Sequence, residues 1–189
     1  MSTLERIFRC PRPLIGMVHL LPLPGAPGYG GTMAAVVKRA VADARAIEEG
    51  GMDAMIVENY GDTPFYRGDL PPETVAALTR CVMEVARVTK LPVGVNALRN
   101  DARTGLAICA ATGARFLRVN VHVGAQLTDQ GIVEGRAAET CRLRVQLCPD
   151  AGILADVGVK HSAPLAPRPL AEEASDAAHR GMADAIVVT

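Results

Sequence analysis

The sequence predicts an α/β fold of repeated βα units closed into a barrel, and three observations carry this prediction. Short runs rich in Val and Ile alternate with segments of helical periodicity, helix-to-strand connections are short, and several strand-to-helix connections are long. Such runs are typical of buried parallel strands, which βα units join by right-handed crossovers. The long connections therefore gather at the C-terminal ends of the strands, the functional face of α/β folds.

Six apolar runs are predicted to be strands, and most end in a polar residue. The runs are Leu14–His19, Ala54–Glu58, Pro92–Asn96, Phe116–Val121, Ile153–Asp156 and Ala185–Thr189. Apolar residues recur at steps of three or four over 37–47, 75–88 and 138–148, which predicts helices. Pro72 and Asp101 are typical helix starts.

An internal repetition separates a barrel from an open sheet. Segments 51–57 and 181–188 resemble each other, each with a glycine that ends a helix followed by a strand. Repeated units of this kind favour a barrel, and an open doubly wound sheet with a pocket at a switch point is the weaker alternative.

Length and composition exclude several classes of protein. The 189 residues predict one domain, 1–189, and the 49% apolar and 21% charged content is that of a globular protein. Twenty basic residues balance twenty acidic ones and only 3% are aromatic, which disfavours nucleic-acid binding. No apolar run is long enough to span a membrane, and no signal core begins the chain, so a cytoplasmic protein is expected. The five cysteines contain no CxxC spacing and are interpreted as small, buried, reduced residues.

The polar strand ends carry the candidate chemistry. Glu58 and Asp156 are the expected general acid and base, and His19 and His122 are the expected proton carriers. Strand alternation places Arg118, Asn120 and His122 on one face, which we expect to point into the barrel.

Other side chains at the same end are expected to bind a substrate. Asn96 and Asn120 suit hydroxyl or enolate oxygens, and Arg118 suits an anion or neutralises Glu58 as a structural ion pair. Lys160 and His161 follow the fifth strand and are expected to close over the site, with Lys160 on an anion.

Cofactor motifs are absent from the sequence. The sequence favours a site without a metal, because no HExxH-type spacing is present. The alternative is a divalent metal bound by His19, Glu58 and Asp156. The Gly-rich loop 20–31 has neither the phosphate-loop nor the dinucleotide spacing, and it is interpreted as a lid or wall. The cofactor is therefore left open.

Five long motifs in order give the chain a resemblance to the BtpA/SgcQ family of barrel proteins. They are IGMVHLLPLPGAPGYGG (15–31), VENYGDTPF (57–65), PVGVNALRNDA (92–102), RVNVHVGAQLTDQGIVEG (118–135) and ILADVGVKHSAPL (153–165). The resemblance implies a (β/α)8 TIM barrel of the ribulose-phosphate-binding type. It adds Asn59, Arg99, Asn100 and Asp129 to the expected substrate-binding residues.

The number of βα units departs from that family. Strands recur about every 34 residues, so eight units need about 270, whereas the sequence stops at the end of the sixth strand. A barrel truncated after the sixth unit is therefore expected. Its exposed strand edges predict a homo-oligomer.

Two functions follow as hypotheses. The first is an isomerase or lyase type of enzyme acting on a small polar metabolite, possibly a phosphorylated sugar-like one. The second, implied by the resemblance because some members are linked to photosystem I biogenesis, is a non-enzymatic assembly or stability factor with a membrane complex as partner.

Overall fold

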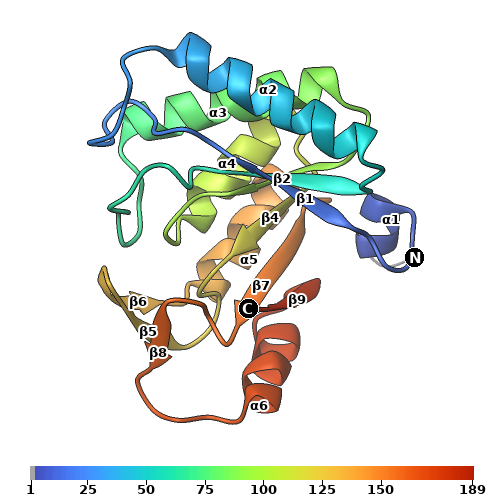
Figure 1. The fold of residues 1–189 in the computed structure, drawn as a ribbon. Helices are drawn as coiled ribbons and strands as arrows, with labels where there is room; N and C mark the ends of the chain where they lie inside the picture. The colour runs from blue at the N-terminus through green and yellow to red at the C-terminus, as the bar shows by residue number, and fades with distance from the viewer. Residues whose placement is uncertain (1–2) are drawn as a thin grey trace.

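A curled sheet of six parallel strands forms the framework of the protein in the computed structural model, which describes residues 3–189 (Figure 1). The strands lie side by side in chain order: β1 (Ile15–His19), β2 (Ala54–Glu58), β3 (Val93–Asn96), β4 (Phe116–Val119), β7 (Gly152–Val157) and β9 (Ala185–Val188). A doubly wound sheet reverses its strand order at a switch point, and this sheet does not. The α/β class and the barrel-like curl are confirmed, while the sheet stays open between β1 and β9.

Helices cover the outer side of the sheet. They are α2 (Met33–Glu49), α3 (Pro72–Val88), α4 (Ala102–Thr112), α5 (Ala137–Leu147) and α6 (Leu170–Ser175), which continues into the π-helical turn η1 (Asp176–Arg180). The outward residues Val57, Val95, Leu117 and Ile153 are fully buried beneath this layer. The predicted helix starts are confirmed, since α3 begins at Pro72 and Asp101 Oδ1 accepts a 2.9 Å bond from the Thr104 amide.

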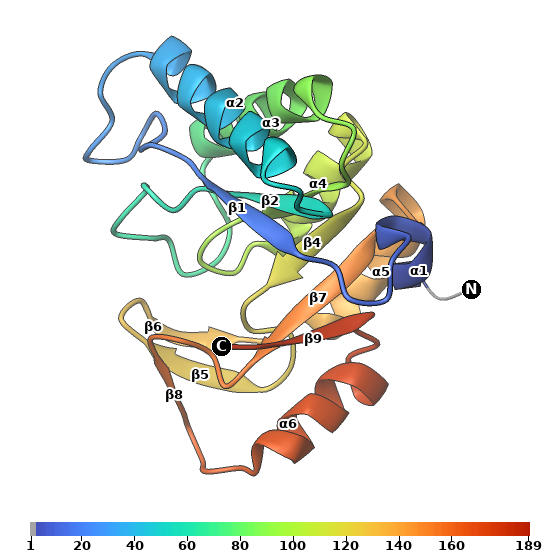
Figure 2. The same cartoon turned by 45° about the vertical axis from the view of Figure 1, so that its right-hand side comes forward.

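The inner side of the sheet is apolar at its N-terminal end, where a helix that the sequence analysis did not predict closes it. Helix α1 (Thr3–Phe8) lies at that end (Figure 2). Ile7 and Phe8 pack against inward side chains of the strands, including Ile56 and Phe116. The rings of Phe8 and Phe116 meet edge to face, with centroids 5.1 Å apart. An apolar layer thus lies beneath the polar strand ends.

A second sheet joins two of the long connections. Strands β5 (Ala125–Thr128), β6 (Gly131–Glu134) and β8 (Ser162–Pro164) pair antiparallel in the order β6-β5-β8. The sequence analysis expected only loops after the fourth and fifth parallel strands, and this was wrong. Strands as short as β8 carry little periodic signal, and their pairing depends on segments far apart in the chain.

We predict that Gly94→Ala destabilises the fold by about 1–3 kcal/mol through overpacking. A Cβ at Gly94 would lie 2.3 Å from the ring of Phe116, which fills the space above it. The free energy of unfolding, measured by urea titration with circular dichroism, should fall. Gly30→Ala is the control, because nothing lies within 4 Å of a Cβ there.

A second substitution identifies the cause of that loss. In a Phe116→Leu background, Gly94→Ala should cost less than in the parent, because the smaller side chain makes room for the methyl group. Equal costs in the two backgrounds would show that the ring of Phe116 is not the obstacle.

Candidate functional site

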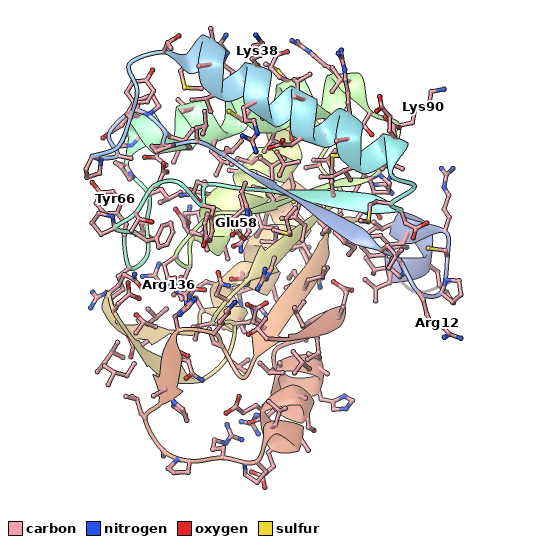
Figure 3. All side chains as sticks on the ribbon, in the orientation of Figure 1. Arg12, Lys38, Glu58, Tyr66, Lys90 and Arg136 are labelled. Atoms are coloured by element: carbon pink, nitrogen blue, oxygen red, sulfur yellow. The ribbon has the colours of Figure 1, made fainter. Side chains whose placement is uncertain are left out.

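A row of polar side chains crosses the inner face at the C-terminal ends of β1, β2 and β3. Parallel register sets His19 beside Glu58 and Glu58 beside Asn96. Asn96 Nδ2 donates a 2.7 Å hydrogen bond to Glu58 Oε2, and His19 Nε2 lies 3.7 Å from Glu58 Oε1. Figure 3 shows Glu58 on the side of the molecule that carries Tyr66, with Arg12 and Lys90 at the opposite end. Glu58 is thus a buried carboxylate with one oxygen fixed and the other turned toward histidine.

Asp156 on β7 is held by two donors from the end of β4. Arg118 donates from Nε (2.8 Å) and Nη2 (2.9 Å) to its two oxygens, and Asn120 Nδ2 donates at 2.8 Å. The side chain of Asp156 is 1% exposed. The bond to Asp156 raises the pKa of Arg118 above its ordinary value, against the opposing effect of burial. This bidentate geometry makes Asp156 a residue that orients Arg118.

Arg118 also connects the two buried carboxylates. Its Nη1 lies 3.9 Å from Glu58 Oε2, a longer approach than its bidentate contact with Asp156. The ion pair that the sequence suggested between Arg118 and Glu58 therefore exists, but Asp156 is the main partner. The guanidinium of Arg118 thus interacts with the carboxylates of both Asp156 and Glu58.

His19 differs from its neighbours in being open to solvent. Its side chain is about half exposed, and its ring stacks on Tyr60, with centroids 4.4 Å apart. Tyr60, in the loop after β2, thus supports the imidazole ring. This arrangement leaves the imidazole accessible both to Glu58 and to water.

Buried amides and one carboxylate fasten the surrounding loops. Asn59 accepts from the Leu98 amide at 2.7 Å and donates to Asp62, which in turn accepts from the Leu23 amide at 2.7 Å. Burial raises the pKa of Asp62. Asn100 donates to and accepts from the backbone of Val121. Asn59 and Asn100, expected to bind substrate, thus have their side chains engaged by the protein.

Hydrogen bonds from two other strand ends hold the loop after β7 at the C-terminal end of the sheet. Arg99 Nη2 donates a 2.7 Å bond to the carbonyl of Lys160, whose amide donates to Thr189 Oγ1 at 3.1 Å. Lys160 and His161 are exposed at this end. Thr189, noticed in the sequence only as a polar strand end, is the anchor that the sequence analysis missed. A strand-terminal threonine is its only sequence signal.

A cavity of about 200 Å³ adjoins the buried carboxylate. Asn120 and Asp156 line it together with Gln126 of the small sheet, and Val157 and Val159 add apolar surface. Asn120 Oδ1 is buried without a hydrogen-bond partner. The site therefore combines a cavity, the carboxylate of Asp156 and the unsatisfied acceptor Oδ1 of Asn120.

Two predicted site residues lie away from this cluster. Asp129 is exposed in the turn between β5 and β6. His122 is buried, with Nε2 2.8 Å from the carbonyl of Gly181, and Nδ1 has no partner. Strand β4 ends at Val119, so the alternation that predicted His122 to point inward no longer applies at that position.

No group of three or more His, Cys, Asp and Glu side chains within 3–189 is arranged to hold a metal ion. The alternative metal set of His19, Glu58 and Asp156 is not supported, because Arg118 and Asn120 occupy the oxygens of Asp156. The same residues include no helix long and apolar enough to cross a membrane. The cytoplasmic location stays a prediction.

The cysteines are all free thiols, two of them fully buried. Burial raises the pKa of Cys81 to about 12 and also raises that of Cys109. A raised pKa keeps a thiol protonated and therefore a poor nucleophile. The interpretation of all five cysteines as buried residues holds for Cys81 and Cys109 and is wrong for Cys10, Cys141 and Cys148, which are partly exposed.

We predict that His122 makes the fold sensitive to mild acid. Burial lowers the pKa of His122 in the folded protein, so the unfolded chain takes up this proton first as pH falls below about 6.5. The free energy of unfolding should therefore decrease over that range. In His122→Gln, whose amide can still donate toward Gly181, the decrease should be smaller.

The exposed His179 provides the matched control. Urea titrations of His179→Gln at the same pH values should give the acid sensitivity of the parent protein. An equal acid sensitivity in His122→Gln and the parent would contradict the assignment to His122.

Comparisons with known proteins identify relatives of this chain. The chain is 45% identical over 186 residues to the photosystem I biogenesis protein BtpA of Synechocystis, which covers 98% of this chain and 65% of that protein. It is 47% identical over 178 residues to an uncharacterised protein of Pyrococcus horikoshii, covering 94% and 68% of the two chains. A Caenorhabditis elegans protein, uncharacterised and named as mitochondrial, is 31% identical over 166 residues, covering 84% and 60%.

The chain thus spans about two thirds of the length of the curated relatives it matches. The family model described as the BtpA family matches residues 10–189, which include all six parallel strands and every side chain of the polar cluster. This chain belongs to the BtpA family.

Proposed function

We propose that this chain is an enzyme that moves protons on a small polar metabolite by isomerase or lyase chemistry. The observation that carries the proposal is the unequal environment of two buried carboxylates. Asp156 has both oxygens engaged by Arg118 and Asn120, whereas Glu58 Oε1 faces the half-exposed His19 at 3.7 Å. Carboxyl groups in different environments take different roles in proton transfer.

The roles follow from these contacts. Glu58 is the base that accepts a proton from a substrate carbon, and His19, reaching both Glu58 and solvent, exchanges that proton with water. Asn96 and Arg118 lie on the other oxygen of Glu58, where a developing enolate would need positive charge and hydrogen-bond donors. Asp156 is a positioning residue for Arg118. The proposal includes that the complete fold is a barrel of the ribulose-phosphate-binding type.

A second candidate function is a non-enzymatic assembly or stability factor. The observation that favours it is the name of the Synechocystis relative, a photosystem I biogenesis protein. The partner in this alternative is a second copy of the chain or a membrane complex. In this alternative, the polar strand ends bind a regulatory ligand.

We predict that Glu58→Gln lowers the rate of proton exchange by about 10²–10⁴-fold, the usual contribution of a general base. Sugar phosphates would be incubated with the protein in D₂O, and deuterium incorporation next to the carbonyl carbon would be followed by NMR. Glutamine keeps the shape and the contact with Asn96 but cannot accept the proton. The melting temperature should stay equal or rise, since active-site polar groups are often strained.

Glu84→Gln is the matched control. Glu84 lies on α3, outside the polar cluster, and pairs with Arg87 at the surface. Its exchange rate should equal that of the parent. Full exchange activity in Glu58→Gln, or no exchange in the parent with any aldose or ketose phosphate, would contradict the proposed enzyme.

The assembly hypothesis makes the opposite prediction. If an outer surface binds the partner, alanine at His19, Glu58 and Asp156 should leave co-purification with cyanobacterial photosystem I unchanged. Affinity capture on the tagged chain, with the partner quantified by its chlorophyll absorbance, is the measurement. Capture that disappears with these three substitutions would count against an independent assembly surface.

A further inference from the structure

Arg99 is a buried cation without a counter-ion in the part of the chain that the structure describes. The residue is 8% exposed, and no carboxylate of residues 3–189 lies within 4.0 Å of its guanidinium among the ion pairs of the protein. Within the described residues, the guanidinium makes one hydrogen bond, from Nη2 to the neutral carbonyl of Lys160, and its Nε is buried without a partner. Buried charges in proteins are normally paired, so this guanidinium is expected to receive an anion.

The strand order places Arg99 over the candidate site. Arg99 lies in the loop after β3 and contacts Lys160 in the loop after β7, and β4 separates those two strands in the sheet. A contact between the two loops must therefore cross the C-terminal end of β4. That strand end carries Arg118 and leads to Asn120. The Arg99–Lys160 contact consequently lies at the same C-terminal end of the sheet as the polar cluster.

Asn120 supplies a second, independent indication of a ligand. Its Nδ2 donates to the acceptor-only carboxylate of Asp156, which fixes the orientation of the amide and leaves Oδ1 as a buried acceptor without a donor. Asn120 also lines the cavity of about 200 Å³. A hydroxyl group on a ligand would satisfy this oxygen.

We infer that the ligand of this site is a hydroxylated oxyanion, with its anionic group on Arg99 and a hydroxyl group on Asn120. The inference rests on the proposed function, because it names the ligand class for that same site. The Nε and Nη2 donors of a guanidinium form a fork that matches a phosphoryl or carboxylate group. Lys160, whose carbonyl accepts the Arg99 bond, is itself an exposed cationic residue.

Calorimetric titration of the full chain with three matched probes tests this inference. Ribose 5-phosphate carries a phosphoryl group, ribonate carries a carboxylate, and ribose carries no charge. We expect ribose 5-phosphate or ribonate to bind and ribose to bind at least tenfold more weakly. The stronger of the two anions identifies which oxyanion the site takes. Failure of both anions to bind, or equal affinity for ribose, would overturn the inference.

Arg99→Gln should then weaken binding of the anionic probe by about 10–100-fold, the range for a hydrogen bond to a charged group. Arg99→Lys should fall between the parent and Arg99→Gln, because it keeps the charge and loses the fork. The exposed Arg103, four residues away on α4, is the control, and Arg103→Gln should bind as the parent does.

Thermal melts separate ligand binding from a structural role. We expect Arg99→Gln to lose the rise in melting temperature that the anionic probe causes in the parent. A variant that melts lower than the parent but binds the probe equally well would show that Arg99 only fastens the loop to Lys160, and would overturn the inference.

Glu58→Gln distinguishes this inference from the proposed function. That variant should bind the anionic probe while losing proton exchange. Retained exchange in Glu58→Gln would reject the proposed base without affecting the result for Arg99, and lost probe affinity in Arg99→Gln would stand on its own.

Discussion

The polar cluster of this protein is organised around one guanidinium held between two buried carboxylates. Arg118 is fixed by its bidentate contact with Asp156 and approaches Glu58 at 3.9 Å. Two carboxylates sharing an inner face would repel each other and lose hydration, and the single cation offsets both effects. Because Arg118 lies closer to Asp156, the two acids become chemically different. Glu58 is left with a free oxygen, and that asymmetry is the basis of the proposed proton transfer.

The apolar half of the inner face makes this arrangement effective. Helix α1 and the ring of Phe116 cover the inner face of the sheet below the cluster with apolar side chains. Charge–charge attraction is stronger where water is excluded. Gly94 contributes to this packing, because the absence of a side chain at that position leaves space for the ring of Phe116. The polar cluster therefore lies directly above tightly packed apolar side chains.

The loops above the cluster are held by buried polar side chains. Asn59, Asp62 and Asn100 bind loop backbone, and the small antiparallel sheet joins the connections after β4 and β7. Backbone groups in loops need partners when they are buried. These contacts explain why conspicuous polar residues at the strand ends need not all touch a ligand. Within residues 3–189, Arg99, Asn120 and His122 are the strand-end or loop residues of this set that retain an unsatisfied buried atom.

Local patterns in the sequence were sufficient for the six parallel strands, the main helices and the polar strand ends. Apolar periodicity and alternation are local properties, and they predicted His19, Glu58, Asn96 and Asp156 at one edge of the sheet. The tertiary structure decided which of these side chains meet. Because β4 ends at Val119, the side chain of His122 contacts the carbonyl of Gly181. Pairing between distant segments forms the second sheet, and α1 packs against the apolar end of the inner face. Such outcomes depend on contacts between residues far apart in the chain, and no local pattern encodes those contacts.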